Sequence, residues 1–212
     1  MKFTPVKTPY LVRWFFSKYT WKKPTAKKIL YLTFDDGPTP EITTWVLQQL
    51  KNYNAKATFF CIGNNIEKHP ELFKTIISEG HNIGNHTQNH IKGWKTSTKK
   101  YLEDVNSCEL IIKKHNNSEQ KNKLFRPPFG QINSKQGKQL IDLGYKIIMW
   151  SILTFDWDKN YTNKQCLNFA LKARRGDVIV MHDSIKASNN LKYMLPKLLE
   201  HYNKKEYLFK TL

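Results

Sequence analysis

Two adjacent carboxylates and two closely spaced histidines are the residues whose types and spacing best suit catalytic chemistry. Asp35 and Asp36 precede a Gly-Pro turn, and taken alone they could equally be the solvated acids of an ordinary turn. His86 and His90 are four residues apart, a spacing that places both imidazoles on one face of a helical turn. Combined with one carboxylate, they would make a two-histidine, one-carboxylate metal site with open positions for water and substrate.

Three further motifs carry polar side chains of catalytic type. Arg126 precedes two prolines, whose rigid and extended backbone would hold the guanidinium in place to orient a carboxylate. Asp156-Trp157 and His182-Asp183 complete the set. Each motif alone has an ordinary structural explanation, but five of them that each follow a predicted strand are much less expected by chance.

The chain reads from residue 28 onward as short apolar runs that alternate with longer helical segments. The predicted strands are 29–34, 57–62, 82–85, 124–126, 146–152, 177–181 and 207–209, and the predicted helices are 40–50, 70–79, 98–114, 134–143, 163–172 and 189–202. Runs such as 147–150 are apolar at every position, which is typical of parallel strands covered by helices. The pattern predicts an α/β fold, a single (β/α) barrel of about seven parallel strands, with an open doubly wound sheet as the alternative. Active sites of such folds form at the carboxyl ends of the strands, where all five motifs lie.

Two segments of unequal size make up the predicted organisation. Residues 28–212 form the barrel domain, and residues 1–27 form an arm that mixes basic and aromatic side chains without a clean period. We expect the aromatic side chains of the arm to pack against the domain. An interfacial membrane anchor is the alternative.

The amino-acid composition excludes several classes of protein and kinds of partner. A chain of 212 residues with 40% hydrophobic and 25% charged residues has the values of one globular domain rather than of a disordered chain. The net charge of +18 would attract anionic polymers, but the lysines are spread along the whole chain without a recognition motif, so we expect no nucleic-acid partner. The three cysteines suggest neither a disulfide nor a cysteine-metal framework. Without a signal-type segment or a spanning apolar run, the default expectation is a cytoplasmic monomer, with surface association left open.

The five motifs together resemble the polysaccharide deacetylases, the NodB-homology group of carbohydrate esterases. The motifs are Thr-Phe-Asp-Asp-Gly-Pro, His-Thr-x-x-His, Arg-Pro-Pro-Phe-Gly, Asp-Trp and Val-Met-His-Asp, and the resemblance spans about residues 28–200. It implies a distorted (β/α) barrel that binds one divalent metal ion. Zinc is the favoured metal, with cobalt or nickel as alternatives, and Asp36, His86 and His90 are the implied ligands.

The resemblance also implies roles for other residues. Asp35 would be the catalytic base, paired with Arg126. His182 would be the catalytic acid, tuned by Asp156. The backbone N–H of Phe129, which replaces a common tyrosine, would contribute to an oxyanion hole.

Two positions depart from the family pattern and bear on the substrate. Leu153 stands where the family often has aspartate, and Val180 near the acetyl pocket stands where it usually has leucine. Trp157 and Phe129 could stack on sugar faces, as could Trp94, although core packing is the ordinary role of such residues.

These observations predict a metal-dependent hydrolase that removes N-acetyl groups from amino sugars of a poly- or oligosaccharide and releases acetate. One alternative is an enzyme for another acyl group, such as O-acetyl xylan or a formyl amide. Another is a non-catalytic glycan-binding barrel, which would have no need for both Asp35 and His182. The sequence leaves the glycan open among chitin, peptidoglycan, surface polysaccharide and lipid-linked sugar.

Overall fold

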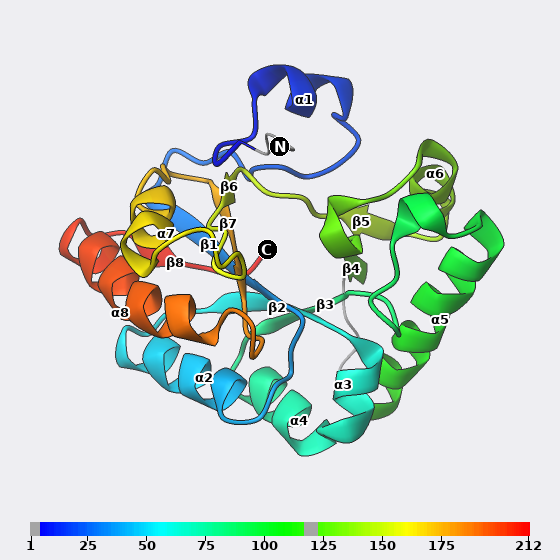
Figure 1. Ribbon diagram of the computed structural model, residues 1–212, viewed down its shortest axis with the longest axis horizontal. Coiled ribbons are helices and arrows are strands. Elements are labelled where there is room, and N and C mark those ends of the chain that lie inside the picture. The colour runs from blue at the N-terminus through cyan, green and yellow to red at the C-terminus, as the bar shows by residue number, and fades with distance from the viewer. Residues whose placement is uncertain (1–4, 117–122) are drawn as a thin grey trace.

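One parallel sheet organises the fold in the computed structural model, which describes residues 5–116 and 123–212. Its strands lie in the order β5-β4-β3-β2-β1-β7-β6, and β8 pairs with the start of β1. The strands are β1 (Ile29–Asp35), β2 (Ala57–Cys61), β3 (Asn82–Asn85), β4 (Lys123–Phe125), β5 (Tyr145–Ile147), β6 (Ile152–Leu153), β7 (Val178–His182) and β8 (Leu208–Phe209). Figure 1 shows this sheet curled into an incomplete barrel with helices around its outside. The predicted barrel of about seven parallel strands is therefore confirmed.

The helices cover the sheet and seal its core. They are α1 (Tyr10–Phe15), α2 (Ile42–Asn52), α3 (Gly63–Lys68), α4 (Pro70–Ser78), α5 (Thr98–His115), α6 (Ser134–Asp142), α7 (Asn163–Ala170) and α8 (Ser188–Lys204), with short 3-10 turns η1 (Gly93–Lys95) and η2 (Pro128–Gly130). In α8 the buried side chains Leu191, Met194, Leu195 and Leu198 follow the helical period and pack in the main core cluster with β1 and β7. The central strand β1 is buried at every position after Ile29, and it pairs with β2 and β7 and, at its start, with β8.

The structure differs from the predicted elements in three places. The predicted strand 146–152 is divided into two short strands. The strand β5 pairs with β4 and β6 pairs with β7, and residues 148–151 between them belong to neither ladder. The helix α3 was not predicted, since the Gly-Asn-Asn start of this six-residue segment carries no apolar period. A short helix, α1, also lies in the arm.

Residues 5–23 of the arm are fastened to the barrel by backbone hydrogen bonds. The Thr8 and Leu153 N–H groups donate to carbonyls of Ser151 and Val6, and Thr20 exchanges bonds with residues 147 and 149. Trp21 is buried against the core, as expected for an arm aromatic. The expectation is wrong for α1, which has no buried residue and projects from the body in Figure 1.

Among the described helices, none has both the length and the apolar character needed to cross a bilayer.

Candidate active site

A cavity of about 760 Å³ collects most of the predicted site residues at the carboxyl ends of the strands. Its lining includes Asp35, Asp36, His86, His90, Phe129, Trp157, Val180 and His182. Arg126 and Asp156 are buried behind the cavity wall, where they contact Asp35 and His182, respectively. The structure thus brings all ten predicted residues together, although they come from motifs spread over about 150 positions of the sequence.

The cluster of Asp36, His86 and His90 could hold a metal ion, because one ligand atom of each lies within 4.8 Å of the others. Asp36 Oδ1 is 3.2 Å from His90 Nε2 and 3.6 Å from His86 Nε2. Ligands bound about 2.0–2.1 Å from a tetrahedral zinc ion lie about 3.3 Å from one another. The observed separations therefore suit such an ion with little rearrangement.

The protonation states of these side chains also suit a cation. Burial lowers the pKa of His86 to about 4, so its imidazole is neutral at neutral pH. Its Nδ1 lies 2.7 Å from the Arg126 carbonyl, and donation to this oxygen leaves the Nε2 lone pair facing Asp36. Burial disfavours the charged form of Asp36, but a hydrogen bond from His90 and the nearby histidine charges lower its pKa overall.

The spacing of the two histidines predicts a shared helical face, and this detail is wrong. His86 directly follows β3, and residues 87–90 form a loop. Thr87 and His90 have φ angles of 66° and 54°, in the left-handed region, and these turns bring the two rings to 5.1 Å between centroids. The loop, rather than a helix, makes the two imidazoles converge.

A fully buried guanidinium holds Asp35. Arg126 Nη1 donates to Asp35 Oδ1 over 2.6 Å and to Thr33 Oγ1 over 2.7 Å. The other Arg126 nitrogens donate to the carbonyls of Ile148 and Met149. Among the hydrogen bonds of the described residues, none reaches Asp35 Oδ2, so this oxygen can accept a proton or a hydrogen bond from a ligand.

His182, the register partner of Asp35 on β7, is held by one carboxylate through two hydrogen bonds. Its Nδ1 is 2.9 Å from Asp156 Oδ1, and its backbone N–H donates to Asp156 Oδ2 over 2.8 Å. Burial alone would lower the pKa of His182, but Asp156, together with Asp36 and Asp35, raises it to about 9. The imidazole is therefore protonated at neutral pH, with Nε2 as its second donor.

Phe129 lines the cavity and has an unusual backbone conformation. Its φ of 59° is left-handed, and within the described residues its N–H has no hydrogen-bond acceptor. Its ring is half exposed and lies 4.5 Å from the His90 ring between centroids. A free donor next to a candidate metal ligand is suited to an oxyanion.

An apolar wall borders His182. Leu153 and Val180 are paired across β6 and β7, both are buried, and both line the cavity. Trp157 stands beside them, with its ring 4.6 Å from that of His182. Trp94, in contrast, lies outside the cavity lining, and its indole N–H donates to the Ile132 carbonyl.

Sequence reasoning left Asp183 without a role, although this residue holds the loop that carries the paired carboxylates. Its side chain is fully buried and accepts hydrogen bonds from the Gly37 N–H and the Thr43 hydroxyl. Burial raises the pKa of Asp183 to about 7. From the other side, Asn65 Nδ2 donates to the Asp36 carbonyl over 2.7 Å. The only sequence signal was the position of Asp183 beside a candidate catalytic histidine.

The outer wall of the cavity was also missed. The α3–α4 junction supplies Lys68 and His69, and the loop after β7 supplies Ile185 and Lys186. These residues belong to no motif, and α3 itself was not predicted, so nothing in the sequence marked them.

Comparisons with known proteins agree with this geometry. The family described as "Polysaccharide deacetylase" matches residues 22–148. A peptidoglycan-N-acetylglucosamine deacetylase of Bacillus cereus is 36% identical over 196 residues, which cover 91% of this chain and 90% of that protein. Chitin deacetylase 2 of Saccharomyces cerevisiae is 30% identical over 79% of this chain and 54% of its own length. The crystal structure of the Bc1960 peptidoglycan N-acetylglucosamine deacetylase superimposes with a TM-score of 0.87 at 34% identity and covers 97% of this chain and 95% of its own.

Fold and site together define a barrel hydrolase of the carbohydrate esterase type. The chain belongs to the polysaccharide deacetylase family, as the sequence motifs predict.

Proposed function

We propose that this protein removes N-acetyl groups from amino sugars of a glycan and releases acetate. One observation carries the proposal: a candidate base held by Arg126 and a candidate acid held by Asp156 line the same cavity as the Asp36, His86 and His90 cluster. A glycan-binding barrel would need neither group, so this pairing favours catalysis over binding alone.

We further propose that Asp36, His86 and His90 hold one divalent ion, zinc in preference to cobalt or nickel, because two imidazoles and one carboxylate are a donor set typical of catalytic zinc sites. When bound, such an ion lowers the pKa of a coordinated water and polarises the acyl carbonyl. The neutral His86, already oriented by the Arg126 carbonyl, supports this assignment.

Asp35 is the proposed base. Its Oδ1 is occupied by Arg126, and its Oδ2 is left to take the proton of the attacking water. Arg126 keeps Asp35 from swinging onto the ion, because three further hydrogen bonds, to the Thr33 hydroxyl and to the carbonyls of Ile148 and Met149, fix the guanidinium. The adjacent carboxylates thereby divide into one proton acceptor and one metal ligand.

The negative charge that develops on the acyl oxygen would be met by the Phe129 N–H, which lacks another partner among the described residues. Removing one such donor typically costs about 10² to 10³ in rate. The acyl methyl group would lie against Leu153, Val180 and Trp157.

His182 is the proposed acid. An amine leaves poorly without a proton, and a charged imidazole that keeps its proton through Asp156 can deliver it from Nε2. The two relatives are named for peptidoglycan N-acetylglucosamine and for chitin, so the proposed substrates are glycans that contain N-acetylglucosamine.

Acetate release from defined substrates tests the proposal. The protein would be freed of metal by chelation and assayed with zinc, cobalt or nickel on chitin oligomers, peptidoglycan and O-acetylated xylan. We expect little activity without metal, recovery with zinc, and turnover of the N-acetyl substrates. Full activity of the metal-free protein would refute the ion site, and turnover of xylan alone would replace the N-acetyl substrate with an O-acetyl ester.

A further inference from the structure

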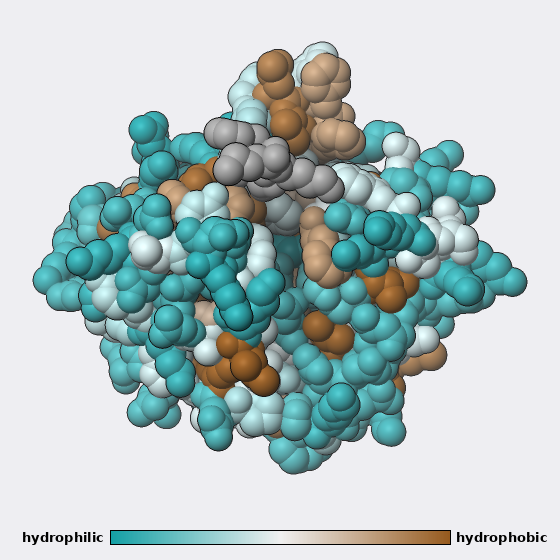
Figure 2. Space-filling model, in the orientation of Figure 1, coloured by the Kyte–Doolittle hydropathy of each residue, from teal (hydrophilic) through white to brown (hydrophobic). Residues whose placement is uncertain are grey.

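The arm carries an apolar surface that the proposed reaction does not use. Five of the eleven large hydrophobic side chains that are exposed among the described residues fall within seven consecutive positions. They are Tyr10, Leu11, Trp14, Phe15 and Phe16, each at least half exposed, and we call them the α1 patch. Figure 2 shows hydrophobic colour gathered on the projecting tip, above a largely hydrophilic body. An exposed cluster of this kind on a water-soluble surface marks an interaction site.

The α1 patch is presented on a rigid support. Backbone bonds fasten the chain to residues 147–151 on both sides of α1, through Thr8 before it and Thr20 after it. The indole N–H of the buried Trp21 donates to the Phe16 carbonyl, and the Phe16 ring stacks on Tyr19. The exposed aromatic residues are therefore held out from the body and do not belong to a loose tail.

Positive charge is concentrated in the segment that carries this patch. Residues 5–34 contain seven Lys and Arg residues and no Asp or Glu. Lys22 and Lys28 form salt bridges with Asp177 and Glu206. The other five, which have no carboxylate partner among the described residues, are Lys7, Arg13, Lys18, Lys23 and Lys27.

We propose that the α1 patch docks this protein onto an anionic lipid bilayer. Tryptophan and tyrosine favour the headgroup level of a membrane, and apolar side chains flanked by lysine and arginine are the pattern of interfacial anchors. Each basic residue near an anionic surface adds about 1 kcal/mol, or about fivefold in affinity. The aromatic side chains would enter the headgroup region while the unpaired cations contact lipid phosphates.

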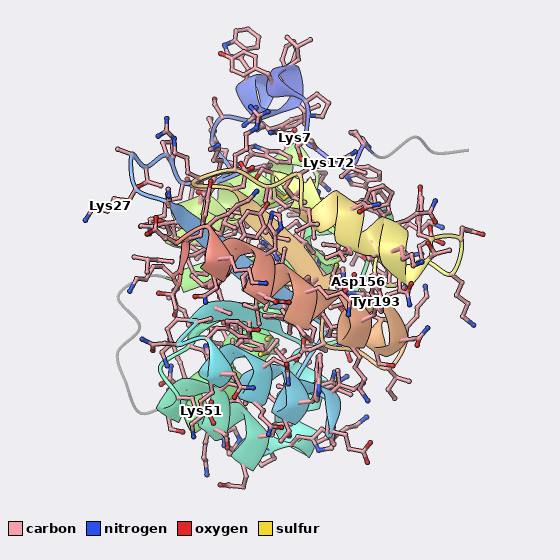
Figure 3. All side chains as sticks on the ribbon, turned by 90° about the vertical axis from the view of Figure 1, so that its left-hand side faces the viewer. Lys7, Lys27, Lys51, Asp156, Lys172 and Tyr193 are labelled. Atoms are coloured by element: carbon pink, nitrogen blue, oxygen red, sulfur yellow. The ribbon has the colours of Figure 1, made fainter. Side chains whose placement is uncertain are left out.

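Two other partners, a second copy of the chain and the glycan substrate, fit the α1 patch less well. A second copy would bring the same basic arm, on a chain of net charge +18, against this one, so like charges would oppose pairing. The glycan that reacts in the cavity would not cover the patch, since no residue of 10–16 lines that cavity. Figure 3 agrees, because α1 at its top lies far from the labelled Asp156 of the site.

Vesicle flotation tests the proposal with the full chain. The probes are vesicles of phosphatidylcholine alone and vesicles that contain about one third phosphatidylglycerol. The test variant combines Trp14→Ala with Phe15→Ala. The control combines Trp94→Ala with Leu110→Ala, which removes a comparable pair of exposed apolar side chains elsewhere. Circular dichroism melting of all three proteins checks that both variants fold.

We expect the wild type to float with the anionic vesicles and much less with the neutral ones. The test variant should lose at least about tenfold in partition coefficient, while the control should bind like the wild type. Raising the salt concentration should weaken binding. Absence of wild-type binding, or equal binding by the test variant, would overturn the proposal.

A wild-type dimer that the test variant converts to monomer, measured by sedimentation, would assign the patch to a second copy. Loss of binding to an insoluble glycan, with vesicle binding unchanged, would assign it to the glycan.

Discussion

Replacing Asp156 with asparagine should make activity depend on pH in a new way. Asp156 accepts two hydrogen bonds from His182, one from Nδ1 and one from the backbone N–H. Burial alone would lower the pKa of this histidine, and Asp156 is the first of the charges that raise it to about 9. The raised value keeps the acid form present until the pH passes through about 9. Without the carboxylate, that form should be lost at lower pH.

The magnitude follows from the two pKa values. With a pKa of about 9, about 97% of His182 is protonated at pH 7.5. If Asp36 and Asp35 only offset the effect of burial, the pKa without Asp156 returns to the ordinary value of about 6.5, and the protonated fraction at that pH is about 9%. Asp156→Asn should therefore lower turnover about tenfold at pH 7.5 from this cause alone. Near pH 5.5 this part of the loss should nearly vanish, because about 90% of an ordinary histidine is protonated there.

Initial rates of acetate release from a chitin oligomer, measured from pH 5.5 to 9.5, give the profile of each protein. Asp158→Asn is a matched control, because it makes the same chemical change two positions away, at a side chain that contacts Asn160 rather than His182. Its basic limb should coincide with that of the wild type, while the limb of Asp156→Asn moves to lower pH.

A constant fold-loss across the whole pH range would refute this reasoning. Asparagine offers one acceptor where His182 presents two donors, so some pH-independent loss from misplacement is expected. A loss of that kind with no movement of the basic limb would mean that Asp156 only orients the histidine.

Three further substitutions test the other parts of the site. Asp35→Asn should lower turnover at least about 10²-fold and leave zinc affinity by calorimetric titration unchanged, since an amide cannot accept the proton of water; loss of zinc instead would show that Asp35 and Asp36 have exchanged roles. His182→Ala should slow N-acetyl substrates by about 10² to 10⁴ and activated aryl acetates far less, because good leaving groups need no acid; equal slowing of both would make it a positioning residue. Gly37→Ala would place a Cβ against the Asp183 carboxylate. We therefore expect thermal unfolding to show about 1–3 kcal/mol of destabilisation, together with weaker zinc binding. An unchanged melting temperature would show that the loop can shift freely.

The strand ends of the site could be predicted from the sequence because one physical rule connects them. Parallel strands expose their carboxyl ends at the same edge, so Asp35 at the end of β1 and His182 at the end of β7 were expected at one edge of the sheet. Their register pairs them directly. The positions of the other motif residues could be predicted in the same way, because each motif comes directly after an apolar run that reads as a strand.

Features set by loop geometry could not be predicted in this way. The approach of His90 depends on two left-handed residues, Thr87 and His90 itself, and neither is a glycine that would signal such a turn. The role of Asp183 depends on Gly37 and Thr43, which lie 146 and 140 positions away in the chain. A carboxylate next to a histidine resembles a solvated residue until those partners are known.

The anchorage of the arm also fixes an order of events during synthesis. The Thr8 hydroxyl donates to the carbonyl of Trp150, a residue 142 positions later, and the neighbouring backbone bonds join the same two regions. A ribosome that adds about 5–20 residues per second would make the arm well before its binding partners. The arm can therefore dock only after residues 147–153 have emerged, and a long loop must close for it to do so. Until then the backbone groups of residues 147–153 that bond the arm are unpaired, and the nascent barrel exposes a strand edge open to other chains.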